Sequence, residues 1–233
     1  MNNLLAAILI LLTAAFPSDA DVPNAAKGQW RWTGVPQFPL EGDSMIYSES
    51  HYTTNIFLGT PPKKFKVTID TGSDLTWVDC VSDKTANMSE YDLTRSKTGS
   101  LVPCAHPLCR ANCNDAQAAC PYNIMYADTS GSSGHLVSDI IRFETLMENS
   151  TAGRSSAQLV FGCSTERNGH EDVQGNLGLG HSAVSIVMQL SEQGKAPRTL
   201  SHCLSGEVKG GGFLVFGRVE LPQMSRTPLV LPQ

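Results

Sequence analysis

One short stretch, residues 65–78, constrains what this chain can fold into more than any other. Apolar and polar residues alternate up to Asp70, and a second β-favouring run follows Ser73. The pattern predicts a strand, a short turn and another strand, with Asp70 at the end of the first. A carboxylate at that place costs free energy unless neighbours hydrogen-bond it, and Thr71, Ser73 and the Gly72 amide are small donors able to do so.

The tripeptide Asp70-Thr71-Gly72 alone is weak evidence, because isolated copies are most often ordinary β-turns. Its flanks are more specific: Trp77-Val78 follows closely, Tyr126 opens a glycine- and serine-rich hairpin, and residues 175–180 read Gly-Asn-Leu-Gly-Leu-Gly. Together they resemble the pepsin-like aspartic proteases, in their plant nepenthesin-like branch. The resemblance runs in order from about residue 35 to the C-terminus and covers one lobe, the N-terminal one, of a two-lobed enzyme. It implies a mostly β fold: one partly closed β-barrel lobe with a flap hairpin and one or two short helices.

The resemblance also implies roles for the residues of this turn. Asp70 would be a catalytic carboxylate, hydrogen-bonded by Ser73, while Thr71 would brace the turn across the lobe interface and Gly72 would complete it. Aspartic proteolysis uses two carboxylates that share one proton: one acts as base on a water, and the other polarises the peptide carbonyl. The sequence has one Asp-Thr-Gly and no Asp-Ser-Gly, so Asp70 supplies half of this pair.

By the same resemblance, the hairpin after residue 120 is the flap that closes over a peptide. Asp128 and Thr129 would form its substrate-binding tip, and the hydroxyl of Tyr126 would meet the indole N–H of Trp77. Without the aspartate motif these two aromatics would be ordinary residues at the edge of a core. Relatives have Tyr-Gly-Asp-Gly-Ser where this chain has Tyr-Ala-Asp-Thr-Ser, and a β-branched residue disfavours positive φ. We therefore expect Gly131 to take over the turn.

Seven cysteines in a chain with secretory features favour disulfides over metal ligation. The four between residues 104 and 120 include no Cys-x-x-Cys element and no histidine at zinc-finger spacing. The resemblance implies two nested bridges there and a third bridge that starts in the loop after the aspartate motif. The implied pairs are Cys104 with Cys120, Cys109 with Cys113, and Cys80 with Cys163. Cys203 would be free, because its counterpart in relatives bridges to the second lobe.

Residues 1–20 have the pattern of a cleaved signal peptide, with an apolar run over residues 4–15 that is too short to span a bilayer comfortably. The expected divisions are a short polar segment at 21–34, the lobe at 35–220 and, at 221–233, the start of a crossing to a second lobe. Sequons predict glycosylation at Asn87 and Asn149. We expect a secretory route to the cell exterior or the vacuole, with no membrane span after signal removal.

Local patterns predict strands almost throughout. The expected strands are 52–58, 65–70, 121–127, 134–143, 158–162, 199–204 and 213–216. The first two would form a hairpin, and residues 185–193 are the one credible helix, with Gly194 just past its end. Residues 81–120 are polar and lack periodicity, so we expect a loop held together by disulfides rather than by a core. Residues 175–180 resemble the hydrophobic-hydrophobic-glycine segment that passes beside the catalytic turn in pepsin-like lobes.

Charge and spacing exclude several other function classes. The net charge is −5, from 17 basic and 22 acidic residues spread along the chain, which leaves no electrostatic footprint for nucleic acid. Residues 175–180 lack the lysine of a phosphate loop and the spacing of a dinucleotide motif. His202 and Cys203 are adjacent on a predicted strand and point to opposite faces, so they cannot form a nucleophile–base pair. We expect no cofactor and no metal, and a peptide or protein as partner.

Three functional hypotheses follow. The first is the N-terminal lobe of a secreted aspartic endopeptidase that is inactive alone, since neither Asp74 nor Asp128 lies in a turn that would replace the second carboxylate. The second is a non-catalytic module that binds peptides or proteins in the same cleft. The third is a homodimer with one Asp70 from each subunit. A lobe without its partner would also leave apolar surface near residues 213–216 and 229–231, which predicts self-association.

Overall fold

The computed structural model describes residues 14–15, 35–42, 51–82, 89–146, 152–169, 172–207 and 210–218. Most of the expected signal peptide lies outside the described residues, as does the polar segment at 21–34. Both sequons, at Asn87 and Asn149, and the expected crossing at 221–233 also lie outside them.

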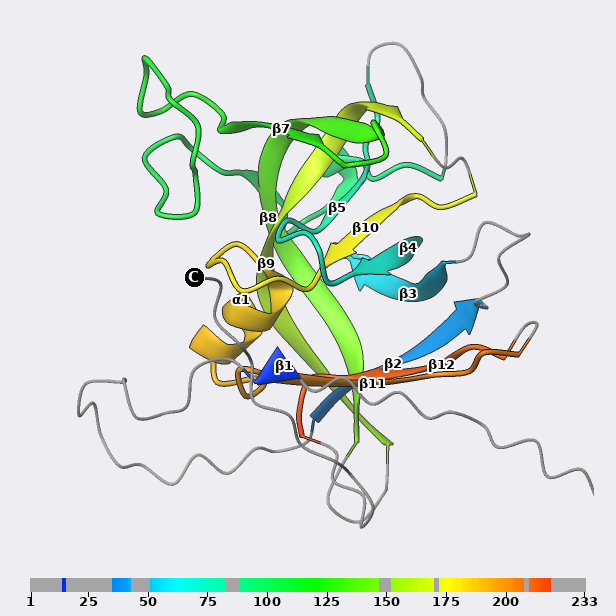
Figure 1. Cartoon of the computed structure of the whole chain (residues 1–233). Helices are drawn as coiled ribbons and strands as arrows, with labels where there is room; N and C mark the ends of the chain where they lie inside the picture. Colours follow the sequence, from blue (N-terminus) through cyan, green and yellow to red (C-terminus); the bar gives the residue numbers. More distant parts are fainter. Residues whose placement is uncertain are drawn as a thin grey trace, which may run out of the picture.

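The described part is mostly β, as predicted (Figure 1). The strands are β1 (Ala14–Ala15), β2 (Val35–Gly42), β3 (Tyr52–Leu58), β4 (Lys63–Asp70), β5 (Trp77–Asp79), β6 (Ser100–Leu101), β7 (Pro121–Met125), β8 (Gly131–Leu146), β9 (Ala152–Asn168), β10 (Gly175–Gly178), β11 (Thr199–Leu204) and β12 (Gly212–Val215). The helical elements are α1 (Ile186–Glu192) and a 3₁₀ turn (Leu93–Arg95). Within the described residues, no helix has the length and apolar character needed to cross a membrane.

The sheet closes partly on itself. From β3, hydrogen-bonded neighbours lead through β4, β10, β5, β9 and β8 and back to β3, and β8 also pairs with β2. Closure depends on β8 and β9, which form one long antiparallel ribbon that crosses the lobe in Figure 1. β11 and β12 extend the sheet beyond β2, and β7 pairs with the first part of β8 as a hairpin. The expected single lobe is confirmed, although the sheet does not form a regular barrel.

Alternating side chains build the main core. In β4, Phe65 and Val67 are fully buried while Lys64 is exposed. In the partner strand β3, Ile56 pairs with Phe65 and is buried with Leu58. These side chains join one apolar cluster with residues of β8, β9 and α1. Each such burial is worth about 1.5–3 kcal/mol relative to exposure, so the period-two pattern fixes which face of the hairpin points inward.

The predicted helix forms as α1 and is fastened to β9. Ser185 caps its start, because the side-chain oxygen accepts the N–H of Met188 at 3.3 Å. Gly194 follows its end with φ of +65°, the left-handed conformation that glycine adopts without strain. The side-chain amide of Gln189 accepts the Val160 N–H at 2.7 Å and donates to the Val160 carbonyl at 2.9 Å. The helix therefore covers the ribbon in a fixed position.

We expected exposed apolar surface at residues 213–216, and for most of this segment the expectation is wrong. β12 lies between β11 and β2, so both of its edges are paired within the chain. Leu214, Val215 and Phe216 are buried, and Phe213, 37% exposed, faces outward. Residues 229–231 lie outside the described part. Self-association stays a prediction.

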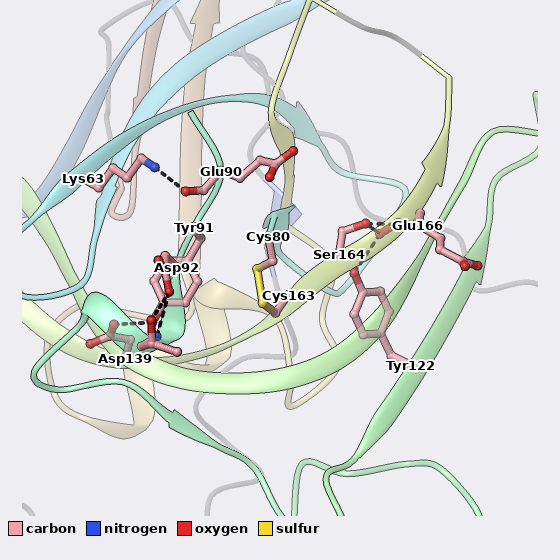
Figure 2. The surroundings of a disulfide bond; sticks show 12 residues. Lys63, Cys80, Glu90, Tyr91, Asp92, Tyr122, Asp139, Cys163, Ser164 and Glu166 are labelled. Carbon is pink, nitrogen blue, oxygen red and sulfur yellow. Dashed lines mark hydrogen bonds between the residues drawn. A yellow bond between two sulfur atoms is a disulfide. The ribbon is translucent and has the colours of Figure 1, made fainter. Parts of the chain in front are cut away.

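Three disulfides form among the described cysteines, and Cys203 is free, as expected. The predicted bridge from Cys80 to Cys163 is present with a Cα–Cα distance of 5.3 Å and joins the end of β5 to β9 (Figure 2). The other two bridges hold the loop that lies over a second apolar cluster. This arrangement agrees with a loop whose order comes from cross-links as well as from packing.

The nested pairing expected within residues 104–120 is wrong. The observed pairs are Cys104 with Cys113 and Cys109 with Cys120. An antiparallel bridge sets Pro103 opposite Ala119, and the Cys104 N–H donates to the Ala118 carbonyl at 2.9 Å. Cys104 therefore lies diagonal to Cys120, and diagonal neighbours are about 7–8 Å apart. That separation exceeds the Cα–Cα span of about 4.4–6.8 Å usual for a disulfide.

Asp139 of β8 lies at the centre of a buried polar cluster (Figure 2). Its carboxylate accepts hydrogen bonds from the hydroxyls of Tyr91 and Thr98 at 2.5 Å and of Ser96 at 2.6 Å. Burial alone would raise the pKa of Asp139, but the hydrogen bonds from Ser96, Thr98 and Tyr91 outweigh it and hold this pKa below its usual range. Burial, together with the bond to Asp139, raises the pKa of Tyr91. The cluster anchors residues 91–98, which have little regular structure, to the core.

We predict that Asp139→Ala lowers the free energy of unfolding by about 3 kcal/mol, because three hydroxyl donors and the Ile140 N–H lose a charged acceptor in a buried place. The measurement is urea unfolding followed by tryptophan fluorescence. The exposed Asp115→Ala is the matched control and should change stability by less than about 1 kcal/mol. Because the pKa of Asp139 is lowered, its contribution is present at neutral pH and fades in acid. Equal denaturation midpoints for the two variants at neutral pH would contradict the anchoring role.

We also predict that non-reducing peptide mapping will distinguish the two disulfide pairings. A digest that cleaves after Leu108 and Arg110 and before Asp115 puts the four loop cysteines on separate peptides. The observed pairing links the peptide that ends at Leu108 to peptide 111–114, whereas nested pairs would link it to the peptide that starts at Asp115. Alkylation before reduction should label Cys203 alone, which controls for disulfide exchange.

Candidate active site

Asp70 is the last residue of β4, and the turn over residues 71–76 leads from it into β5. β10 lies between these two strands, parallel to β4 with Gly178 opposite Asp70, and antiparallel to β5 with Asn176 opposite Trp77. The close approach requires glycine, since a Cβ on Gly178 would lie 2.4 Å from the backbone of Asp74. The expectation that residues 175–180 pass beside the aspartate turn is confirmed.

The carboxylate of Asp70 is held by three donors. The Gly72 N–H donates to Oδ1 at 2.8 Å, and the Ser73 hydroxyl donates to Oδ2 at 2.5 Å. The side-chain amide of Asn176 also donates to Oδ2, at 3.2 Å. Within the described part of the chain, Thr71 lies exposed at the tip of the turn and makes no hydrogen bond to Asp70. Two of the three donors expected from the sequence therefore serve the carboxylate, and the bracing role of Thr71 stays a prediction.

The predicted aromatic pair forms beside this turn. The indole Nε1–H of Trp77 donates to the hydroxyl of Tyr126 at 2.8 Å, and Trp77 is buried. Burial raises the pKa of Tyr126, although its hydrogen bonds with Trp77, Ser73 and Asn176 act in the opposite direction. The phenol is thus protonated throughout the physiological range, where it serves as donor and acceptor.

The tip of the hairpin differs from what the sequence predicts. Thr129 has φ of +70°, the only positive φ among the described non-glycine residues. We expected Gly131 to take over the turn, but Gly131 instead begins β8, where it pairs with Met125. Two bonds flank the strained residue: the Ser130 N–H donates to Asp128 Oδ1 at 3.0 Å, and the Asn168 amide donates to the Thr129 carbonyl at 3.0 Å. A β-branched residue in this conformation costs about 1–3 kcal/mol, which these contacts offset.

A cavity of about 220 Å³ lies between the hairpin and the aspartate turn. Its lining combines both parts of the predicted site. The lining includes Asp70, Trp77, Tyr126, Asp128, Arg167 and Asn176. The structure thus brings the catalytic and flap candidates to one place, although Thr71 and Gly72 lie on the exposed turn and the carboxylate of Asp128 caps its own turn.

The other residues considered from the sequence, Asp74, His202 and Cys203, contribute to the structure of the lobe. Asp74 Oδ1 accepts the Ser182 N–H at 3.0 Å, which links the aspartate turn to the segment before α1. His202 is 7% exposed and burial lowers its pKa, whereas Cys203 is half-buried on the same strand. Among the described residues, the sulfur atoms of Cys104, Cys109 and Cys113 lie as close together as the ligands of a metal ion. All three belong to disulfides.

Sequence reasoning missed an ion pair at the edge of the cavity. Arg167 Nε donates to Asp79 Oδ1 at 2.9 Å, and this contact joins β5, two residues after Trp77, to the end of β9. Arg167 pairs across the ribbon with Ser132 at the start of β8, just after the hairpin tip. Burial raises the pKa of Asp79 to about 6, with Arg167 lowering it and Glu90 raising it further. Nothing in the local sequence around residue 79 indicates this long-range partner.

We predict a pH-dependent contribution of Asp79 to stability. Its pKa in the folded protein, about 6, exceeds the ordinary value of 3.8, so the folded state binds the proton more tightly. The free energy of unfolding of the wild type should therefore rise, relative to Asp79→Asn, as pH falls from about 7 to about 4. Thermal unfolding across this range measures the difference. Asp115→Asn should track the wild type, and a constant gap between wild type and Asp79→Asn would contradict the prediction.

Residues 52–218 match the protein family described as "Xylanase inhibitor N-terminal". Among curated proteins, the chain is 36% identical to Aspartic proteinase 39 of Arabidopsis thaliana, over 82% of this chain and 44% of that protein. It is 34% identical to an aspartic proteinase of Oryza sativa subsp. japonica, over 94% of this chain and 51% of that protein. The chain thus spans about half the length, or less, of these relatives.

Solved structures show the same fold at low identity. Conglutin gamma, a basic 7S globulin from lupine seeds, has a TM-score of 0.61 at 20% identity, over 82% of this chain and 51% of that chain. An aspartic proteinase from Irpex lacteus has a TM-score of 0.55 at 18% identity, over 83% of this chain and 51% of that chain. With the matched family and the curated relatives, these findings establish that the chain belongs to the xylanase inhibitor N-terminal family of pepsin-like plant aspartic proteinases, of which it covers an N-terminal part.

Proposed function

We propose that this chain supplies the N-terminal lobe, and one of the two catalytic carboxylates, of an aspartic endopeptidase. The observation that carries the proposal is the environment of Asp70: its carboxylate borders a cavity under a hairpin and is held by the Gly72 N–H and the Ser73 hydroxyl. A peptide is the substrate class that fits a cleft between a hairpin and a catalytic turn.

In the proposed reaction, Asp70 and a second carboxylate share one proton. The ionised carboxylate takes a proton from water as that water attacks the peptide carbonyl, and the protonated one donates to the carbonyl oxygen. The hydrogen bonds from Gly72 and Ser73 fix the orientation of the Asp70 carboxylate, so that it does not have to be ordered before the reaction. Tyr126, held by Trp77, fixes the base of the flap over the cavity.

A second candidate function is a non-catalytic peptide- or protein-binding module on the same fold. One observation favours it: the matched family is described by an inhibitor. Such a module would keep the cavity and the flap and would bind without turnover. The two candidates differ in whether Asp70 is required for an effect on the bound peptide.

We propose a secretory route, to the cell exterior or the vacuole. The three disulfides support it, because such bridges persist in oxidising compartments. The signal peptide at residues 1–20, glycosylation at Asn87 and Asn149, and association with a C-terminal lobe or a second copy belong to the same proposal.

We predict that the purified chain cleaves peptides weakly or not at all by itself. The test measures pepstatin-sensitive cleavage of a peptide library at acid pH by the wild type and by Asp70→Asn, alone and with the C-terminal half of Aspartic proteinase 39 added in trans. Under the proposal, cleavage appears or rises when the second half is added, and Asp70→Asn abolishes it, a loss of about a thousandfold or more. Asn123→Leu, an exposed substitution on the hairpin, is the control and should retain the activity.

Each result selects one hypothesis. Robust cleavage by the chain alone, proportional to its concentration, would overturn the view that it is half of a site. Cleavage that grows with the square of concentration would indicate the homodimer. Tight peptide binding that is equal in wild type and Asp70→Asn, with no cleavage under any condition, would favour the binding module.

A further inference from the structure

Asn176 is a buried polar residue for which the expected roles at this site give no account. It lies in β10, all four residues of which are buried, and its own exposed fraction is 7%. Its position is the first of the pair that the resemblance to pepsin-like lobes expects to be hydrophobic. A buried amide is costly unless it is hydrogen-bonded, so its partners show what holds it there.

Within the described residues, the side-chain hydrogen bonds of Asn176 all lead to the aspartate turn and the hairpin. Its Nδ2 lies 2.9 Å from the Ser73 hydroxyl oxygen, 3.2 Å from Asp70 Oδ2 and 3.3 Å from the Tyr126 hydroxyl oxygen. The amide has two hydrogens for these three oxygens. Which contacts it makes most strongly therefore depends on the charge and the orientation of the acceptors, and an ionised carboxylate is the strongest acceptor of the three.

The backbone holds this amide in one place. β10 is hydrogen-bonded to β4 on one side and to β5 on the other, with Asn176 opposite Thr68 and Trp77. Its neighbour Gly175 permits the close approach to β5, since a Cβ there would lie 2.1 Å from the Trp77 carbonyl oxygen. The donor is thus fixed by the same strands that carry Asp70 and Trp77, and it does not have to be ordered when a ligand arrives.

We propose that Asn176 is a positioning residue that couples the charge on Asp70 to the flap. Its amide lies within hydrogen-bond distance of both Asp70 Oδ2 and the Tyr126 hydroxyl. When Asp70 is ionised, the amide is drawn to the carboxylate; when Asp70 is neutral, the amide shifts its hydrogen bonding toward Tyr126, whose hydroxyl also accepts the Trp77 indole N–H. The catalytic meaning of this coupling rests on the proposed function, but the coupling itself is a property of these residues in the chain alone.

The test uses nitrogen-15 NMR of the whole chain at neutral pH, which needs no activity. Two signals report on the network: the side-chain amide pair of Asn176, and the indole N–H of Trp77, assigned by its loss in Trp77→Phe. Asp70→Asn keeps the shape of the side chain and removes its charge. It should move both signals. With leucine at position 176, the indole shift that Asp70→Asn causes should fall to less than half of its size in the wild type. This second shift is measured as the double variant against Asn176→Leu alone.

A second readout separates hydrogen bonding from space filling. Leucine keeps the branching of asparagine at Cγ and removes its hydrogen-bonding groups, so a residue that only fills space would tolerate Asn176→Leu without change in the network. Under the proposal, the Trp77 indole proton exchanges with solvent about fivefold faster in Asn176→Leu, the effect of losing one ordinary hydrogen bond. Asn123→Leu makes the same substitution at an exposed position of the hairpin and should leave the exchange rate unchanged.

Two results would overturn the proposed coupling. If the Asn176 amide signals do not respond to Asp70→Asn, or if the indole responds equally with leucine at position 176, Asn176 does not couple the two groups. Should Asn176→Leu fail to fold, Asp70→Asn alone decides the question: the Asn176 amide and the Trp77 indole must both shift, and an amide shift without an indole shift would overturn the coupling. Coupling without any cleavage in the trans assay would retain this inference and reject the proposed protease. Cleavage without coupling would do the reverse.

Discussion

The insertion of β10 between β4 and β5 is the contact on which the rest of the site depends. The Leu179 N–H donates to the Asp70 carbonyl at 2.8 Å, and the Gly180 N–H donates to the Ser73 carbonyl at 2.9 Å. The aspartate turn is therefore held by backbone hydrogen bonds, which a side-chain substitution does not remove directly. The same strand completes the path by which the sheet closes on itself. One four-residue strand thus orients the carboxylate and links the two halves of the sheet, which explains why Gly175 and Gly178 lie where a Cβ would collide with the neighbouring backbone.

Stability in this lobe comes from two different sources. The main cluster, under the closed part of the sheet, is held by buried apolar side chains that alternate along the strands. The described part of the segment between β5 and β7 packs on a second apolar cluster, and two disulfides and the carboxylate of Asp139 hold it in addition. Because that carboxylate is buried with three hydroxyl donors, specific hydrogen-bond geometry orders residues 91–98 in addition to buried apolar area. Such a segment responds to acid and to reduction more than the main core does.

The sequence predicted best where one periodic pattern or one ordered motif sufficed. Alternation around Phe65 and Ile56 predicted the central hairpin, and the resemblance carried by Asp70, Trp77 and Tyr126 implied the aromatic pair that forms beside the cavity. It failed where the outcome depends on register between distant segments. The bridge between Pro103 and Ala119 decides which cysteines lie within reach of each other, and a pairing carried over from the resemblance does not include this register.

Two further features escaped prediction for a similar reason. Thr129 accepts a left-handed conformation because Asn168, on a strand that pairs with the hairpin, binds its carbonyl. Local propensity alone favours glycine for that conformation. The role of Asn176 was hidden because its partners come from three separate segments, and an asparagine between glycine and leucine has no local signature of a ligand or a catalyst. The ion pair of Asp79 with Arg167 is likewise long-range.

The arrangement around Asp70 also limits what chemistry this part of the fold supplies. Each group that contacts the carboxylate within the described residues is a donor: an amide N–H from Gly72, a hydroxyl from Ser73 and an amide N–H from Asn176. A donor-only shell orients a carboxylate and favours its role as an acceptor, but it offers no second acidic group with which to share a proton. The turn is half-buried on this side and exposed at Thr71 and Gly72 on the other. The described residues around Asp70 thus orient its carboxylate, and under the proposed function the group that shares its proton comes from outside them.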